Sequence, residues 1–204
     1  QENSFPGLRG NVVAGRIANR VNLGGTNCVV DAACASSLSA SHLASMELAA
    51  GRADMVVTGG VDCFNDIFMY MCFSKTPALS ARGDARPFDR GADGTILGEG
   101  LGMVVLKRLA DAERDGDRVY AVLKGVGSSS DGRGKSIYAP SAEGQVKALR
   151  KAYENSGVPA STVELVEAHG TGTSVGDGVE LAALSEVYKE SGARVNSVAL
   201  GSVK

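Results

Sequence analysis

The sequence predicts an α/β protein in which short buried strands alternate with helices. Two observations carry this prediction. The β-branched runs at residues 26–31 and 54–58 have the length and composition of buried strands, and apolar residues recur at helical spacing in the segments around them. Strands that are separated by helices of ten or more residues are typical of layered α/β folds.

The first half of the chain gives clear boundaries for these elements. Glycine pairs or single glycines end most of them, as expected at helix C-termini and turns. The following elements are expected: a helix over 11–21 ended by Gly24 and Gly25, a strand over 26–31, a helix over 35–50 ended by Gly51, a strand over 54–58 closed by Gly59 and Gly60, and an ordered glycine-rich loop over 80–100.

The second half repeats the alternation. The expected elements are a strand over 101–106, a short charged helix over 110–115, a strand over 119–126, a helix over 142–155, a strand through 165–166, a helix over 177–189 and a strand over 197–200. A glycine-rich turn, a strand, a small residue and a helix recur over residues 24–50 and 157–190, which hints at two similar halves.

Composition excludes several classes of protein. A chain of 204 residues that is 44% hydrophobic can bury a core on the scale of one large domain or part of a bigger one. Its net charge of −2, from 21 Lys and Arg against 23 Asp and Glu, gives no reason to expect nucleic acid or an anionic membrane as a partner. No stretch reaches the ~18 apolar residues that a membrane span needs.

Cys34 lies in the strongest local pattern, DAACASSL over residues 31–38, where a predicted strand runs through small residues into a helix. A thiol at a helix N-terminus meets unsatisfied N–H groups and the positive end of the helix dipole, which favour a nucleophilic thiolate. A buried cysteine that packs as a small hydrophobe is the alternative. This pattern alone leaves both interpretations open.

His169 lies in a second pattern, EAHGTGTSVGD over residues 167–177. A catalytic histidine suits a rigid strand end beside glycines, where a ligand can approach the backbone, and beside hydroxyls that can bind it. A core histidine next to a glycine-rich turn is the alternative. A third pattern, GSVK, delivers Lys204 at a predicted strand end and is uninformative alone.

Other residues suggest no chemistry. His42 shares the apolar face of a predicted helix and is interpreted as structural. Gly98, Gly100 and Gly102 lack the spacing of a dinucleotide-binding loop. The four cysteines form no C-x-x-C pair and the chain has only two histidines, so no metal site is expected.

In combination, the motifs resemble the β-ketoacyl synthase (ketosynthase) family, the condensing enzymes of fatty-acid and polyketide synthesis, over essentially the whole chain. DAACASSL is similar to the family's nucleophile motif, EAHGTGT to its first catalytic histidine motif, and GSVK to the start of its lysine motif. RPFD (86–89) and GEGLGMVVLKRL (98–109) are similar to its spacer. Residues 69–80 and 129–145 look closest to polyunsaturated fatty acid synthases, with iterative type I polyketide and glycolipid synthases near.

The resemblance implies a thiolase-like fold, in which two similar α/β halves form a five-layered αβαβα sandwich, usually as a homodimer. It implies that residues 1–204 are an incomplete part of a longer ketosynthase domain, lacking the N-terminal strands and a second catalytic histidine. It also implies an acyltransferase. Cys34 takes an acyl group from acyl carrier protein, and a malonyl-carrier protein then loses CO₂ and attacks the acyl-cysteine. His169 stabilises the enolate that decarboxylation forms.

The resemblance assigns further residues. Thr171 and Thr173 are expected to hydrogen-bond the phosphopantetheine arm. Lys204 is expected to organise the electrostatics of the site, with Glu180 in support. Phe73 is expected to line an acyl pocket near the dimer interface, although an aromatic core residue is the alternative.

No metal or bound cofactor is implied, because phosphopantetheine arrives on the carrier protein. The expected partners are acyl carrier protein domains and malonyl and acyl thioesters, within a cytoplasmic multidomain synthase.

Gly178 departs from the family, which usually has proline there. Three alternatives stay open: another iterative or modular type I ketosynthase, a non-catalytic partner subunit of the chain-length type, and a thiolase. The partner subunits lack the nucleophilic cysteine, and thiolases lack the HGTGT and GSVK pair.

Overall fold

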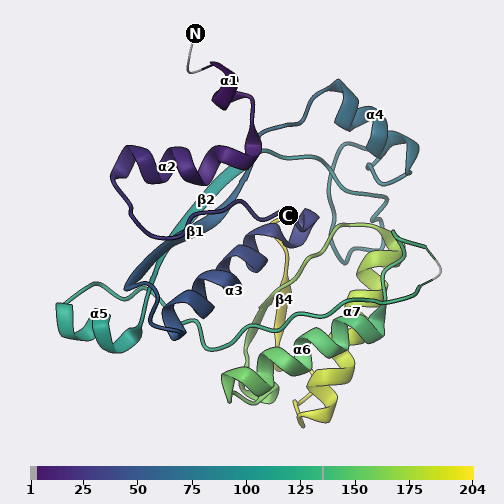
Figure 1. The fold of residues 1–204 in the computed structure, drawn as a ribbon. Helices are drawn as coiled ribbons and strands as arrows, with labels where there is room; N and C mark the ends of the chain where they lie inside the picture. Colours follow the sequence, from purple (N-terminus) through teal and green to yellow (C-terminus); the bar gives the residue numbers. More distant parts are fainter. Residues whose placement is uncertain (1–3, 135) are drawn as a thin grey trace. The chain divides into compact units, whose positions relative to one another are not determined.

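The computed structural model of the chain describes residues 4–134 and 136–204. It divides into two compact units, Gln1–Cys63 with Glu99–Ala121 and Phe64–Gly98 with Val122–Lys204. Strands and helices occur in both units (Figure 1), which confirms the predicted α/β class. None of the helices described is long and apolar enough to cross a membrane.

A two-stranded antiparallel sheet forms the centre of the first unit. Strand β1 (Met55–Asp62) pairs with β2 (Gly100–Lys107), and helix α3 (Ser36–Ala49) packs against β1 (Figure 1). Gly60 allows this packing, because a Cβ there would lie 2.9 Å from the Cβ of Ser37. A glycine in the strand therefore sets how closely the first turn of α3 approaches the sheet.

Short helices and one arginine complete the first unit. The helices are α1 (Ser4–Gly7), the 3₁₀ turn η1 (Gly10–Val12), α2 (Val13–Val21) and α5 (Leu109–Asp115). Arg108 donates hydrogen bonds to the carbonyls of Leu48 (3.0 Å) and Ala53 (2.7 Å), and to the carboxylate of Asp54 (2.8 Å). A helix leaves its last carbonyls without partners, so Arg108 stabilises the C-terminal end of α3.

The second unit combines a short parallel sheet with two packed helices. Strand β3 (Leu165–Glu167) pairs in parallel with β4 (Ala199–Gly201), and α6 (Ala142–Ser156) packs on α7 (Ser174–Glu190). The 3₁₀ turn η3 (Ala160–Thr162) precedes β3. The buried core cluster of this unit consists of Val146, Ala160, Ala183, Val187 and Tyr188.

Helix α4 (Ile67–Lys75) has an unusual surface. It begins at Asp66, whose side chain accepts a hydrogen bond from the N–H of Met69 (3.0 Å), as a helix N-cap does. The helix is rich in apolar residues and none of them is buried. Ile67 is 80% exposed and Phe68 is 66% exposed.

Two predicted strands are wrong. Residues 26–31 and 119–126 form no ladder with any described residue. Part of the second segment lies against α6 instead: a Cβ at Gly125 would lie 2.6 Å from the backbone nitrogen of Ser156, and Asn155 donates a hydrogen bond to the carbonyl of Val126 (2.9 Å). β-branched runs indicate where a chain suits a strand, but a strand also needs a partner.

Several boundaries also differ from expectation. Helix α2 ends at Val21, as predicted, but the residue that caps it is Asn22, with φ of +55°, and not the predicted glycine pair. Gly59 and Gly60 lie inside β1 and do not close it. Helix α4 was not expected from its sequence. The helices predicted over 35–50, 142–155 and 177–189 are confirmed within a few residues.

Gly59 and Gly102 give a matched test of the sheet. A Cβ at Gly59 would strike the carbonyl oxygen of Gly102 and lie 2.8 Å from the Cα of Met103, whereas nothing lies within 4 Å of a Cβ at Gly102. We expect Gly59→Ala to lower the free energy of unfolding by about 2 kcal/mol or more, and Gly102→Ala to change it by less than about 1 kcal/mol. Urea titration of the two variants would contradict this packing if both gave equal losses.

Candidate active site

Cys34 lies on a tight turn at the start of α3. The turn is the 3₁₀ segment η2 (Ala33–Ala35), and Ala33 has φ of +49°, which is unusual for a residue with a Cβ. Ser36 stabilises this turn, because its hydroxyl accepts from the N–H of Ala32 (2.9 Å) and donates to the carbonyl of Ala33 (2.7 Å). The Cys34 thiol is free and exposed. It is therefore not a buried cysteine that packs as a small hydrophobic residue, which was the alternative.

His169 lies two residues beyond the end of β3. The pairing with β4 reaches almost to it, because the N–H of Ala168 donates to the carbonyl of Gly201 (2.8 Å). The carboxylate of Glu180 on α7 then accepts two successive N–H groups, from His169 (2.7 Å) and from Gly170 (2.9 Å). One carboxylate therefore fixes the backbone that carries the imidazole.

The surroundings of His169 favour a neutral ring. Partial burial among protein atoms lowers the pKa of His169 below its ordinary value, and the nearby Lys204 ammonium acts in the same direction. Glu180 and Asp177 act in the opposite direction, but more weakly. A neutral imidazole can still donate one hydrogen bond.

Asp177 is a site residue that the sequence analysis did not assign. Its side chain lies in the first turns of α7 and is buried, with 7% of the residue exposed. One carboxylate oxygen accepts the N–H of Gly172 (3.0 Å), and the other accepts the N–H of Phe88 (2.7 Å). Asp177 therefore joins the loop after His169 to the segment around Phe88. The sequence does contain a pattern that points to Asp177, because an acidic residue near a helix N-terminus directly follows a glycine-rich loop.

Thr171 and Thr173 lie side by side. Their hydroxyl oxygens are 2.9 Å apart, and the Thr173 hydroxyl also accepts the N–H of Gly176 (3.2 Å) as the N-cap of α7. A Cβ at Gly176 would lie 2.5 Å from that hydroxyl, so glycine is required there. One hydroxyl proton is used between the two threonines, which leaves the pair with one proton to donate elsewhere.

Lys204 follows β4 on a segment that a second glutamate holds. Glu167, at the end of β3, accepts the N–H of Val203 (2.7 Å). The Ser202 hydroxyl lies 3.3 Å from the carbonyl oxygen of His169. The structure thus brings His169, Glu180 and Lys204 together in the second unit, while Cys34 belongs to the first.

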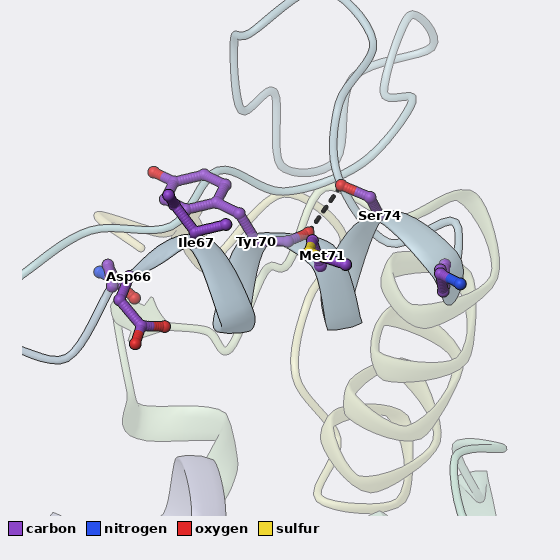
Figure 2. Close-up of a pocket in the computed structure, with 7 residues that line it drawn as sticks. Asp66, Ile67, Tyr70, Met71 and Ser74 are labelled. Atoms are coloured by element: carbon purple, nitrogen blue, oxygen red, sulfur yellow. Dashed lines mark hydrogen bonds between the residues drawn. The ribbon is translucent and has the colours of Figure 1, made fainter.

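Phe73 lies on α4 in the second unit and is half-buried, as is Met69 one turn earlier. It does not line the open pocket of about 690 Å³ on this helix (Figure 2), which is formed by Asn65, Asp66, Ile67, Tyr70, Met71, Ser74 and Lys75. The expected acyl-pocket role of Phe73 therefore stays a prediction. His42 is half-buried on α3, as its structural interpretation requires.

Residues 4–134 and 136–204 contain no group of three His, Cys, Asp or Glu side chains that could hold a metal ion. Gly178, the departure noted in the sequence, lies in α7 with nothing within 4 Å of a Cβ built on it. Glycine is thus not required at this position by packing. We have no structural account of why it stands there.

Comparison with known proteins gives two family matches. Residues 1–112 match the family described as beta-ketoacyl synthase, N-terminal domain, and residues 120–204 match beta-ketoacyl synthase, C-terminal domain. The chain is 53% identical over 203 residues to one subunit of the polyunsaturated fatty acid synthase of Thraustochytrium, covering 98% of this chain and 7% of that protein. It is 42% identical over 193 residues to one subunit of the phenolphthiocerol/phthiocerol polyketide synthase of Mycobacterium tuberculosis, covering 95% of this chain and 10% of that protein.

A solved structure agrees with these matches. The ketosynthase from module 6 of the bacillaene synthase of Bacillus subtilis superposes with a TM-score of 0.94 at 41% identity. The alignment covers 98% of this chain and 36% of that chain. The thiolase-like fold that the resemblance implies is confirmed, and residues 1–204 span about a third of that structure.

Removing the Asp177 carboxylate should loosen both loops that it joins. Asp177→Ala removes the acceptor of the buried N–H of Gly172 and of the partly buried N–H of Phe88, so we expect the free energy of unfolding to fall by about 2 kcal/mol or more. Asp84→Asn, which alters an exposed pair with Arg86, should cost less than about 1 kcal/mol. Chemical denaturation of the two variants measures this difference, and equal effects would contradict the bridging role.

The lowered pKa of His169 predicts a pH dependence of stability. In the unfolded chain the imidazole takes up a proton below its ordinary pKa of 6.5, while in the folded protein it resists protonation until lower pH. Stability from this source is therefore complete above that value and is lost as the pH falls. Between about pH 8 and about pH 5, the wild-type protein should lose more melting temperature than His169→Gln. A larger loss in the variant would contradict the sign.

Proposed function

The chain belongs to the β-ketoacyl synthase family, and we propose that its residues catalyse the decarboxylative condensation of an acyl thioester with a malonyl thioester. The observation that carries this proposal is the fixed position of His169 at the end of β3, held by Glu180 and adjacent to Lys204. This is the setting that a preorganised hydrogen-bond donor for an enolate requires.

In the first half-reaction, the Cys34 sulfur attacks the carbonyl carbon of an acyl thioester on a carrier protein. The thioester bond to the carrier breaks, the carrier leaves as a free thiol with the proton from Cys34, and an acyl-cysteine forms. A cysteine suits this step because sulfur is both a good nucleophile and a good leaving group. The exposed thiol on the η2 turn supports this assignment.

In the second half-reaction, a malonyl thioester loses CO₂. The electron pair of the broken C–C bond moves into the thioester to give an enolate. We propose that the His169 N–H donates to its oxygen, and the loss of one such donor typically costs about 10²–10³ in rate. The enolate carbon then attacks the acyl-cysteine, releases Cys34 and gives a 3-oxoacyl thioester two carbons longer.

We also propose roles for the remaining residues, and the interactions described above support those of the threonines, Lys204 and Glu180. The threonine pair, Thr171 and Thr173, offers one hydroxyl proton to the phosphopantetheine arm. Lys204 adds positive charge near His169, which favours the developing enolate. Glu180 acts on the backbone of His169 and is a positioning residue. Phe73 is proposed to line the acyl pocket.

The partners proposed are acyl carrier protein domains, within a longer cytoplasmic ketosynthase-containing synthase of the polyunsaturated fatty acid or polyketide type. The similarity to the polyunsaturated fatty acid synthase of Thraustochytrium supports that type.

A homodimer is also proposed, because an exposed helix such as α4 that is apolar on most sides suits an interface. A sedimentation profile of the complete protein that showed only monomer would contradict the dimer.

Cysteine labelling tests the nucleophile directly. All four cysteines, Cys28, Cys34, Cys63 and Cys72, are exposed, so simple accessibility predicts labelling of all of them. We expect an acyl-carrier protein to transfer its acyl group to Cys34 alone in the complete protein. Intact-protein mass spectrometry should show the added mass in the wild type and in Cys63→Ala, and no added mass in Cys34→Ala. Equal labelling of the wild type and Cys34→Ala would contradict the assignment.

A further inference from the structure

We propose that Phe88 is a positioning residue for His169. Its strained backbone is joined to Gly172 through Asp177, and its aromatic ring contacts Gly170. This inference rests on the proposed function, since it assigns Phe88 a part in the malonyl half-reaction. Phe88 lies 81 positions before His169 in the sequence and contacts the loop that follows it.

The backbone of Phe88 is the first observation. Its φ is +63°, in the left-handed region, where a bulky side chain is disfavoured. Only four described residues other than glycine adopt a positive φ, and one of the other three is Ala33, next to Cys34. Such strain persists only where surrounding contacts impose it, and it concentrates at functional sites.

The contact that imposes this conformation is with Asp177. The N–H of Phe88 donates to one oxygen of this buried carboxylate at 2.7 Å, while the other oxygen accepts the N–H of Gly172 at 3.0 Å. Gly172 is bonded a second time, because its carbonyl accepts the N–H of Gly94 (3.0 Å). The segment from Phe88 to Gly94 is thereby tied to the loop that carries His169.

The aromatic ring makes the second contact. A Cβ at Gly170 would lie 3.1 Å from Cε2 of Phe88 and 2.5 Å from the Cβ of Ser202. The ring and Ser202 therefore leave no room for a side chain on Gly170. Gly170 itself has φ of +46°, and its N–H is held by Glu180.

These contacts act on the residue that precedes Gly170. The backbone N–H of His169 is fixed by Glu180, and the Phe88 ring limits movement of the next residue, Gly170. A shift of about 1 Å in a catalytic group can cost a factor on the order of 10² in rate. Loss of the ring should therefore slow the step that uses His169 and leave acyl transfer to Cys34 largely unchanged.

The test compares Phe88→Ala and Phe88→Tyr with Phe5→Ala in the complete protein. Phe5 is a second phenylalanine, 66% exposed on α1, and serves as the matched control. Malonyl-carrier protein decarboxylation and Cys34 acylation are measured separately. Phe88→Ala should decarboxylate about 10- to 100-fold more slowly while acylation stays within about twofold, and Phe88→Tyr, which keeps the ring, should restore decarboxylation.

Amide hydrogen exchange decides the inference independently of activity. In Phe88→Ala, the peptide over residues 168–173 should exchange faster than in the wild type, while the α3 peptide over 36–49 should exchange as before. Unchanged exchange over 168–173, or equal losses in both half-reactions for Phe88→Ala, would overturn the role of Phe88. A wild-type protein that exchanges as expected but neither accepts acyl groups nor decarboxylates would overturn the proposed function instead. If Phe88→Ala fails to fold, Phe88→Leu is measured in the same way.

Discussion

Two carboxylates on one face of α7 hold the second unit's candidate site together. Asp177 and Glu180 are three residues apart, so they project from the same side of the helix. Between them they accept four backbone N–H groups, from Phe88, His169, Gly170 and Gly172. No strand among the described residues pairs with these N–H groups, and an N–H group away from water is costly when it has no acceptor. The conformation of the histidine loop depends on this pair.

In the first unit, a cationic side chain binds backbone carbonyl groups, where the carboxylates of the second unit bind N–H groups. Arg108 donates to the carbonyls of Leu48 and Ala53 at the C-terminal end of α3, the helix that begins beside Cys34. Glycines allow the close packing in both units. Gly60 lets α3 approach β1, and Gly170 leaves room for the ring of Phe88. Each proposed catalytic side chain thus lies at the end of a helix or strand. Charged side chains fix the position of that element, and glycines let its neighbours pack closely.

The sequence predicted the helices well and the strands unevenly. Apolar spacing depends only on local residues, and it placed α3, α6 and α7 within a few residues of their positions. Strand pairing depends on distant partners, so residues 26–31 and 119–126 were assigned wrongly. The motifs around Cys34, His169 and Lys204 were visible because they are contiguous. The roles of Asp177 and Phe88 were not, because they arise from a contact between residues 89 positions apart.

His169 is proposed to stabilise the enolate independently of Cys34. The most direct measurement uses the complete protein with Cys34→Gln, which cannot form an acyl-cysteine, and follows the release of CO₂ from malonyl-carrier protein. We expect this variant still to decarboxylate, and the addition of His169→Ala to lower the rate by a factor of about 10² or more. Equal rates with and without His169 would show that this histidine does not stabilise the enolate.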